Sequence, residues 1–353
     1  MTAHSMRPMA ITLGDPAGIG PEIIVKAFRD APELTRGCFV AGDVATLRAA
    51  CRLLAAPGRP GLPVAVLATP SEVADVPPGC VPVLQAIAPP EGVQVGHVGA
   101  AAGRAAGDCV VWAARAALAG DIAAIVTAPL HKESLAAAGF PFPGHTELLQ
   151  AEAAAHLGRP VSQVPVRMML ANDELRTVLV SIHMSLRDAI AAVTPANVLD
   201  TVRIAHRALV AALGRAPRIG VAGLNPHAGE GGLFGREEVE VIAPAIAAAR
   251  VEGIDVHGPY APDTVFMRAR HTAGKPGEFD VVIAMYHDQG LIPVKYLGVD
   301  KGVNVTLGLP LVRTSPDHGT AFDIAGQGRA DAASLIEAIR MARALLPGAL
   351  RRA

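Results

Sequence analysis

The chain has 353 residues, about half of them hydrophobic, and its 31 basic residues nearly balance 32 acidic ones. That length suits one large domain or two ordinary ones. The net charge of −1 argues against a general binder of nucleic acid or of an anionic membrane, because such proteins carry a basic surplus.

Short strand-like runs alternate with longer helical patterns along the whole chain. We expect strands at residues 9–14, 38–41, 64–67, 123–127, 166–170, 177–182, 218–223, 280–285 and 303–307. We expect helices from Pro21 onward and at residues 45–54, 109–118, 146–157, 196–213, 237–250 and 332–345. The proline-rich stretch 77–90 is predicted to be a loop. This alternation indicates an α/β protein with a largely parallel sheet.

Targeting and redox signals are absent from the sequence. Its N-terminus lacks the long apolar stretch of a signal peptide, and no run reaches the ~18 apolar residues expected of a membrane span. None of the four cysteines forms a C-x-x-C pair, so we expect reduced thiols. These features predict a soluble, cytoplasmic protein.

Three histidines, His183, His227 and His287, each follow a predicted strand. Neighbouring strands can bring their ends together, and three imidazoles leave a divalent cation open positions for a substrate. Polar residues surround His227 (225–232) and His287 (286–290), and burying them without partners would be costly. The alternative is three unrelated loop residues. The histidines at 97, 131, 156, 206, 257 and 271 are interpreted as surface or satisfied structural residues.

Two further sets of residues favour an anion. In Gly144-His145-Thr146-Glu147, Thr146 is either an ordinary helix cap or first-turn residue, or part of a helix N-terminus that meets an anion. Lys295, Asn304 and Arg313 follow at nine-residue intervals. They are either solvated surface residues or a binding site for a carboxylate or phosphate, and their apolar neighbours favour the binding site.

Several common catalytic motifs do not occur in the sequence. It contains no G-x-G-x-x-G, P-loop, G-x-S-x-G or H-E-x-x-H. Their absence excludes a Rossmann fingerprint and disfavours a P-loop kinase, an α/β-hydrolase and a zincin. A nicotinamide cofactor would need another binding device.

The sequence resembles the 4-hydroxythreonine-4-phosphate dehydrogenase family over nearly the whole chain, including the candidate residues named above. The matching segments are GDPAGIGPE (14–22), GHTE (144–147), LNPHAGEGG (224–232), APDTVF (261–266), YHDQG (286–290), GVNVTLGLP (302–310) and RTSPDHGTAFDIAG (313–326). After YHDQG the chain continues Leu291-Ile292-Pro293-Val294-Lys295, a departure from the family's pattern. Paralogues that oxidise 4-phosphorylated threonate or erythronate share nearly all these motifs.

The resemblance implies a role for each matched position. His183, His227 and His287 would hold a divalent metal (zinc, magnesium or cobalt), and Asp288 and Lys295 are candidates for proton handling. The implied substrate-binding residues are His145, Thr146, Lys295, Asn304 and Arg313. The loop that resembles a cofactor loop holds the implied NAD or NADP contacts: His318, Gly319, Thr320, Asp323 and Gly326.

The resemblance also implies the architecture. The fold would be the two-domain α/β type of isocitrate and isopropylmalate dehydrogenases. One domain would comprise residues 1–145 and about 316–353. The other, about 146–315, would carry the metal and substrate residues and the dimer interface. Each active site of the homodimer would take His183 and His227 from one chain and His287 from its partner.

The implied reaction is a metal-dependent, NAD(P)-linked oxidation of 4-phosphohydroxy-L-threonine in vitamin B6 synthesis. Its β-keto acid product would decarboxylate to 3-amino-2-oxopropyl phosphate. A 4-phospho-D-threonate or D-erythronate dehydrogenase is the alternative within the family. A metal-dependent lyase or aldolase is the alternative from another class, and a catalytically idle binding protein is disfavoured by the intact residue set.

Overall fold

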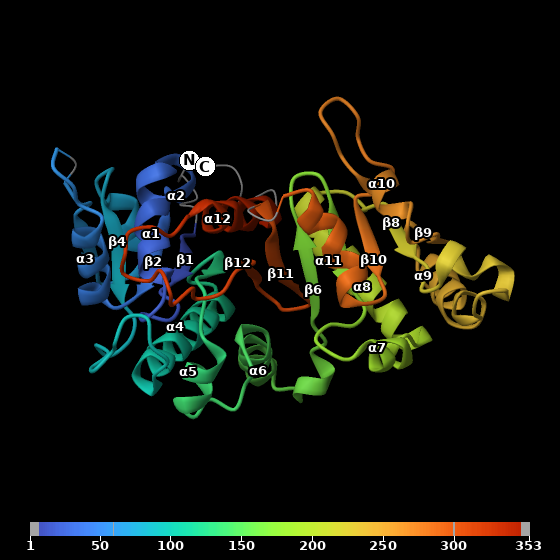
Figure 1. The fold of residues 1–353 in the computed structure, drawn as a ribbon, viewed down its shortest axis with the longest axis horizontal. Helices are drawn as coiled ribbons and strands as arrows, with labels where there is room; N and C mark the ends of the chain where they lie inside the picture. The colour runs from blue at the N-terminus through green and yellow to red at the C-terminus, as the bar shows by residue number, and fades with distance from the viewer. Residues whose placement is uncertain (1–6, 59, 299–300, 347–353) are drawn as a thin grey trace. The chain divides into compact units, whose positions relative to one another are not determined.

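The computed structural model describes residues 7–58, 60–298 and 301–346 and consists of two compact units (Figure 1). Unit 1 is drawn from residues 1–165 and 309–353, and unit 2 from residues 166–308. Residues 1–6 and 347–353 of the predicted first domain lie outside the described residues. Helix α6 (His145–Leu157) packs against α4 (Ala100–Ala119) within unit 1, whereas the boundary expected near residue 145 assigned it to the other domain.

Unit 1 contains a parallel sheet. Its strands are β1 (Met9–Thr12), β2 (Cys38–Gly42), β3 (Val64–Leu67), β4 (Val81–Gln85), β5 (Ala124–Thr127) and β12 (Val312–Pro316). They lie in the order β3-β4-β2-β1-β5-β12, and their pairings are parallel. The chain passes from β1 to β2 on one side, while β5 pairs with β1 on the other. Such a switch point is where open α/β sheets bind ligands.

Two groups of helices pack in unit 1. The first contains α1 (Gly20–Asp30), α2 (Pro32–Thr35), α3 (Val44–Leu53) and α12 (Ala333–Leu345), and the second contains α4, α5 (Lys132–Ala137) and α6. Alternate strand residues such as Ala10, Phe39 and Ile125 form a buried core with Val110 of α4 and Leu149 of α6. Figure 1 shows the C-terminal helix α12 returning beside β12 and α1.

Unit 2 contains a mixed sheet in the order β11-β6-β7-β10-β8-β9. Its strands are β6 (Arg167–Ala171), β7 (Arg176–Leu179), β8 (Ile219–Ala222), β9 (Val256–Tyr260), β10 (Val281–Ala284) and β11 (Val303–Leu307). The β11–β6 and β6–β7 pairings are antiparallel, and the other three are parallel. Its helices are α7 (Leu186–Ala192), α8 (Pro195–Leu213), α9 (Ala243–Val251), α10 (Val265–Ala269) and α11 (His287–Tyr296).

The predicted α/β alternation is confirmed, and the nine predicted strands are present, seven with shifted ends and two, β3 and β11, with the predicted ends. Strands β4, β9 and β12 were not predicted. The prediction of a loop over residues 77–90 is wrong at β4, because its apolar residues Val81 and Val83 are fully buried between β2 and β3 despite the flanking prolines.

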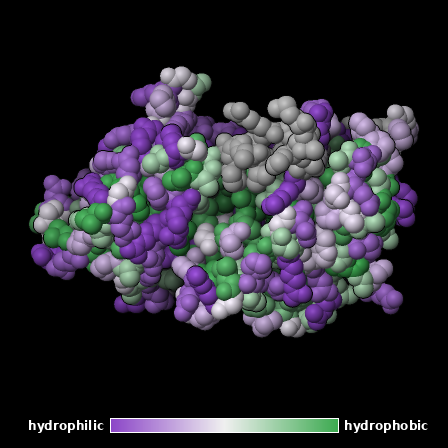
Figure 2. Space-filling model, turned by 180° about the vertical axis from the view of Figure 1, so that it is seen from behind, coloured by the Kyte–Doolittle hydropathy of each residue, from purple (hydrophilic) through white to green (hydrophobic). Residues whose placement is uncertain are grey.

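The surface is chemically mixed. Figure 2 shows hydrophilic and hydrophobic residues interspersed over one face. In unit 2 the exposed hydrophobic side chains include Leu186 of α7 and Ile292 and Tyr296 of α11, which are 59%, 64% and 89% exposed. None of the helices within the described residues combines the length and apolar character needed to cross a membrane.

A buried carboxylate joins β8 and β10 at their amino ends. Asp280 accepts hydrogen bonds from Arg215 Nη2 (2.7 Å), Arg215 Nη1 (2.9 Å) and the backbone N–H of Arg218 (2.7 Å). Burial alone would raise the pKa of Asp280, but these hydrogen bonds outweigh it and hold that pKa well below its ordinary 3.8. Ionised Asp280 therefore stabilises the folded state at neutral pH.

We expect Asp280→Asn to lower the free energy of unfolding by about 2–3 kcal/mol at pH 7, because the side chains of Arg215 and Arg218 both form ion pairs with Asp280 and lose their charged partner. Since the folded pKa is depressed, this contribution is present above the unfolded pKa and is lost as the pH falls below about 4. Urea titrations at pH 7, 5 and 3 would show the deficit of the variant shrinking at low pH.

Glu278→Gln is the matched control, because Glu278 pairs with Arg268 at the surface and such pairs contribute less than about 1 kcal/mol. An equal loss of stability in the two variants at pH 7 would contradict the assignment of a stabilising role to Asp280.

Candidate functional site

The three candidate metal ligands follow three adjacent strands. Parallel pairing joins β7 to β10 and β10 to β8, so the carboxyl ends of these strands lie at one edge of the sheet of unit 2. His183, His287 and His227 come three to five residues after those ends. The expectation that neighbouring strands carry the three histidines is confirmed.

His183 and His287 lie side by side, with ring centroids 5.5 Å apart. Both line a pocket together with Ser181, Ile182, Met184, Leu186, Ala189, Tyr286 and Asp288. His287 Nδ1 is 2.7 Å from the carboxylate of Asp288, which leaves Nε2 for another partner. A carboxylate that orients an imidazole in this way is typical of metal-binding histidines, so this pair fits a divalent cation.

His227 lies in a second pocket of unit 2. Its lining includes Asp263, Phe266, Gln289 and Ile292, and Tyr286 and Asp288 line this pocket as well as the first. Within the described part of one chain, no three His, Cys, Asp or Glu side chains come close enough together to hold a metal. The pair that one chain brings together is therefore His183 with His287.

The backbone around His227 has an unusual conformation. Residues 227–231 all have positive φ, between 45° and 78°. Three of them, His227, Ala228 and Glu230, are not glycine, and each costs about 1–2 kcal/mol in this region because Cβ approaches the carbonyl oxygen. Strain of this kind persists only where neighbouring structure holds it, and it is concentrated at functional sites.

Gln289 and Glu238 fix the backbone that follows β8, which leads to His227, and Gln289 also fixes the backbone that follows β10, which leads to His287. Gln289 donates to the carbonyl of Gly223 (2.8 Å) and accepts from the N–H of Met285 (2.7 Å), so it links the ends of β8 and β10. Glu238 accepts from the N–H groups of Leu224 and Asn225, both at 2.7 Å. Neither role was predicted, although the position of Gln289 within YHDQG was a usable signal.

In unit 1, a buried arginine forms the centre of the candidate anion site. Arg313 on β12 is 3% exposed, and its Nε and Nη2 donate to Thr127 Oγ1 at 3.1 and 2.7 Å. Burial lowers the pKa of Arg313 to about 10, against the opposing charge of Glu147. The guanidinium therefore keeps its charge at neutral pH, which favours binding of an anion.

His145 contributes to the same site. Burial and then the nearby charge of Arg313 hold its pKa well below 6.5, so the imidazole is neutral at pH 7. Its Nε2 is buried with no hydrogen-bond partner among the described residues, which fits a polar ligand. Thr146 is the second residue of α6, whose N-cap Gly144 supplies no side-chain hydrogen bond.

The other two predicted anion ligands belong to unit 2. Lys295 lies in the last turn of α11, and Asn304 lies on β11. The structure therefore places His145, Thr146 and Arg313 in unit 1, and Lys295 and Asn304 in unit 2.

The predicted cofactor loop connects β12 to α12 and is fastened to the start of α1. The N–H of Ile19 donates to the carbonyl of Thr320 (3.0 Å). At the downstream end, Glu22 accepts from the N–H of Ala330 (2.7 Å), and Lys26 donates to the carbonyl of Gly328 (2.9 Å). These contacts fix the loop at Thr320 and at residues 328–330, on either side of Asp323 and Gly326, while His318 and Gly319 directly precede the first contact.

The interpretation of His131 as a surface or satisfied residue is wrong. Its ring stacks on Phe322 of the predicted cofactor loop at 4.8 Å, and its Nδ1 is buried with no hydrogen-bond partner among the described residues. Asp15, fully buried beside it, has its pKa raised by burial, although hydrogen bonds from Ala17 and Ser134 oppose the shift. Both residues follow the switch-point strands β1 and β5.

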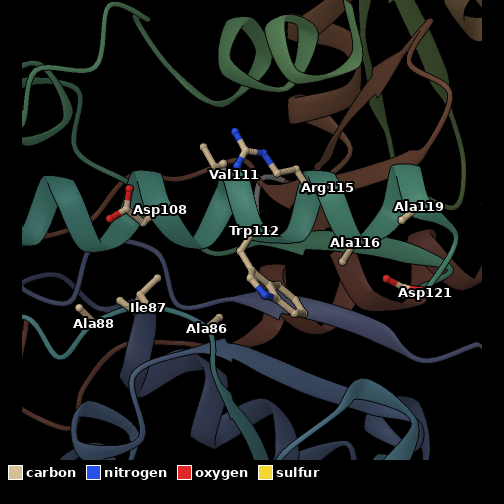
Figure 3. A pocket seen from close by; sticks show the side chains of 10 residues that line it. All are labelled: Ala86, Ile87, Ala88, Asp108, Val111, Trp112, Arg115, Ala116, Ala119 and Asp121. Atoms are coloured by element: carbon tan, nitrogen blue, oxygen red, sulfur yellow. The ribbon is translucent and has the colours of Figure 1, made fainter. Parts of the chain in front are cut away.

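A further groove runs along α4 in unit 1. Figure 3 shows Trp112 and Arg115 leaving the helix in opposite directions, with Asp108 near the middle of the helix and Asp121 just after its end. Trp112 packs edge-on against buried Phe39, and Arg115 is paired with Glu152. No predicted site residue lines this groove.

Comparison with known proteins gives consistent results. The model of the family "Pyridoxal phosphate biosynthetic protein PdxA" matches residues 35–342. The chain is 53% identical over 330 residues to a 4-hydroxythreonine-4-phosphate dehydrogenase of Beijerinckia indica, covering 93% of this chain and 92% of that one. It is 46% identical to a D-threonate 4-phosphate dehydrogenase of Salmonella typhimurium, covering 96% and 99%.

A solved structure agrees with these sequence comparisons. The crystal structure of 4-hydroxythreonine-4-phosphate dehydrogenase from Klebsiella pneumoniae superposes with a TM-score of 0.83 at 42% identity, covering 96% of this chain and 99% of that one.

We expect Arg313→Met to abolish most of the rise in melting temperature that inorganic phosphate produces, because a ligand stabilises the folded state only through its affinity for it. Methionine keeps the apolar length of the arginine and removes its charge. Thermal melts across a phosphate titration would measure the effect. Arg36→Met, which alters an exposed ion pair, is the control, and an undiminished rise in Arg313→Met would show that phosphate binds elsewhere.

Proposed function

This chain belongs to the family of the pyridoxal phosphate biosynthetic protein PdxA, and we propose that it is an NAD(P)-linked, metal-dependent dehydrogenase of a small phosphorylated hydroxy acid. The proposed substrate is 4-phosphohydroxy-L-threonine. Oxidation of its secondary hydroxyl yields a β-keto acid that decarboxylates to 3-amino-2-oxopropyl phosphate. The name of the relative that is 53% identical supports this choice of substrate.

The observation that carries the metal proposal is the His183–His287 pair, with His287 oriented by Asp288. His183, His227 and His287 would hold the cation, which is zinc, magnesium or cobalt. A bound divalent cation lowers the pKa of a hydroxyl that it contacts and thereby favours its deprotonation. Asp288, which lines both histidine pockets, and Lys295 are the proposed groups for moving that proton.

The remaining residues bind and orient the reactants. Arg313 and the neutral His145 would take the phosphate, together with Thr146, Lys295 and Asn304. The loop with His318, Gly319, Thr320, Asp323 and Gly326 would hold NAD or NADP, in an isocitrate dehydrogenase-like fold. Anchoring of this loop by Glu22 and Lys26 supports a binding role, because an ordered loop loses less entropy on binding.

Two further proposals concern assembly and location. Each active site takes histidines from both subunits of a homodimer, and the exposed apolar side chains Leu186, Ile292 and Tyr296 support an interface in unit 2. The protein works in the cytoplasm, and its balanced charge supports partners other than nucleic acid or membranes.

A second candidate function is oxidation of 4-phospho-D-threonate or D-erythronate. The observation in its favour is the 46% identity to a D-threonate 4-phosphate dehydrogenase. A metal-dependent lyase or aldolase would use the same histidines and phosphate grip without forming NAD(P)H.

The test of function is a screen of 4-phosphohydroxy-L-threonine against the two phosphorylated sugar acids, with NAD and with NADP, followed at 340 nm. We expect the highest kcat/KM with 4-phosphohydroxy-L-threonine. Exhaustive chelation should abolish turnover and a divalent cation should restore it, because imidazoles alone leave the hydroxyl too weak an acid. Full activity after verified metal removal would refute the metal dependence, and cleavage of substrate without any absorbance at 340 nm would favour the lyase.

The shared site is tested with His183→Ala, His227→Ala and His287→Ala, which should each be inactive as homodimers. Each pair of variants is unfolded, mixed and refolded. About half the dimers are then mixed, and a mixed dimer has one intact site only when the two histidines come from different subunits. Such a mixture recovers roughly a quarter of the unsubstituted activity.

If the partner supplies His287, both mixtures that contain His287→Ala recover activity and the third does not. If it supplies His227, recovery follows His227→Ala instead. No recovery in any of the three mixtures, with mixed dimers confirmed by mass, would mean that the site lies within one chain.

A further inference from the structure

We propose that Glu238 is a positioning residue, which holds the left-handed turn of residues 227–231 and thereby sets the direction of the His227 imidazole toward the metal. The proposal rests on the proposed metal-dependent function. It adds a residue that lies outside every motif on which the family resemblance was based.

The carboxylate of Glu238 is placed at the entrance of the turn. The side chain is buried, with 2% exposure. Its Oε1 accepts from the N–H groups of Leu224 and Asn225, both at 2.7 Å, and its Oε2 accepts from Asn225 Nδ2 at 2.9 Å. Asn225 lies two residues before His227, so these three hydrogen bonds fix the backbone where the turn begins.

The same carboxylate also touches the middle of the turn. A Cβ atom added to Gly229 would lie 2.6 Å from Glu238 Oε2, which is closer than any real contact allows. A Cβ atom on Gly223 would lie 3.0 Å from Glu238 Oε1. Glu238 therefore packs directly against the backbone on both sides of His227.

The local helix geometry explains how Glu238 reaches this position. Glu238 is the first residue of a π-helical turn (η4, Glu238–Ile242) that runs into α9. Single π-helical turns are wider than α-helical ones and occur often at functional sites. Here the turn directs a buried carboxylate at the end of β8, while the preceding Glu237 accepts from Asn225 Nδ2 at 2.7 Å.

The turn itself offers a matched pair of substitutions. Gly229 and Gly231 both have left-handed backbones, with φ of 78° and 67°, so alanine is strained to a similar degree at each. Only Gly229 abuts Glu238, because nothing lies within 4 Å of a Cβ atom added to Gly231. The next nearest group is the backbone carbonyl oxygen of Gly235, 3.1 Å from the Cβ atom added to Gly229. A difference between the two variants therefore reports displacement of the groups that abut Gly229, and agreement of Glu238→Gln with Gly229→Ala assigns it to the Glu238 carboxylate.

The experiment measures metal binding directly, so that it does not depend on turnover. Apo protein of each variant is titrated with Co²⁺, with affinity from calorimetry and ligand geometry from the visible absorption spectrum. We expect Gly229→Ala to weaken Co²⁺ binding at least tenfold and to change the spectrum, and Gly231→Ala to weaken it less than about threefold. Glu238→Gln, which turns an amide NH₂ toward Asn225 Nδ2, should resemble Gly229→Ala and does not require a new Cβ atom.

Circular dichroism identifies the variants that fold, and Co²⁺ affinities and spectra are compared among the folded variants only. Unchanged affinity and spectrum in Glu238→Gln and Gly229→Ala would overturn the positioning role, as would an equal loss in Gly231→Ala, which would assign the effect to backbone strain alone. Failure of the unsubstituted protein to bind Co²⁺ would instead overturn the metal-dependent function and, with it, this role.

Discussion

Parallel pairing of β7, β10 and β8 is the constraint on which the candidate metal site depends. Because their carboxyl ends point the same way, loops that are 44 and 60 residues apart in the sequence leave the sheet at one edge. The strands place His183 and His287 with their rings 5.5 Å apart. At the start of α11, the carboxylate of Asp288 then occupies Nδ1 of His287 and leaves its Nε2 available.

Strain and buried charge are coupled around His227. A run of left-handed residues that includes three non-glycines is unfavourable by itself. Its neighbours offset that cost with charge-assisted hydrogen bonds to a carboxylate that water does not reach. Such hydrogen bonds are stronger than neutral ones. The conformation of a proposed ligand therefore depends on a residue eleven positions further along the chain.

Unit 1 shows the same relation between burial and chemistry. Arg313 is buried and keeps its charge, while His145 beside it loses its proton because burial and a neighbouring cation both disfavour imidazolium. An anion bound there would meet one fixed charge and one neutral hydrogen-bonding group. Nearby, the stacked rings of His131 and Phe322 connect the end of β5 to the predicted cofactor loop. The switch point of the parallel sheet thus adjoins the loop expected to hold the cofactor.

The sequence by itself determined nine of the strands, the longer helices and most of the candidate residues. Hydrophobic periodicity indicated the α/β class, because period 2 and period 3.6 reflect local backbone geometry. The polar residues at strand ends indicated His183, His227 and His287, because buried polar groups need partners. The apolar neighbours of Arg313 indicated an anion-binding arginine.

Only the tertiary structure decided which residues support them. Strand β4 is recognisable only once β2 and β3 cover it, and the roles of Glu238 and His131 depend on contacts between distant segments. The left-handed turn of residues 227–231 likewise arises from packing, because non-glycine residues disfavour a left-handed backbone. Such contacts have no signature in a single sequence, since their residues are ordinary in composition and gain their roles from the side chains and backbone that folding places against them.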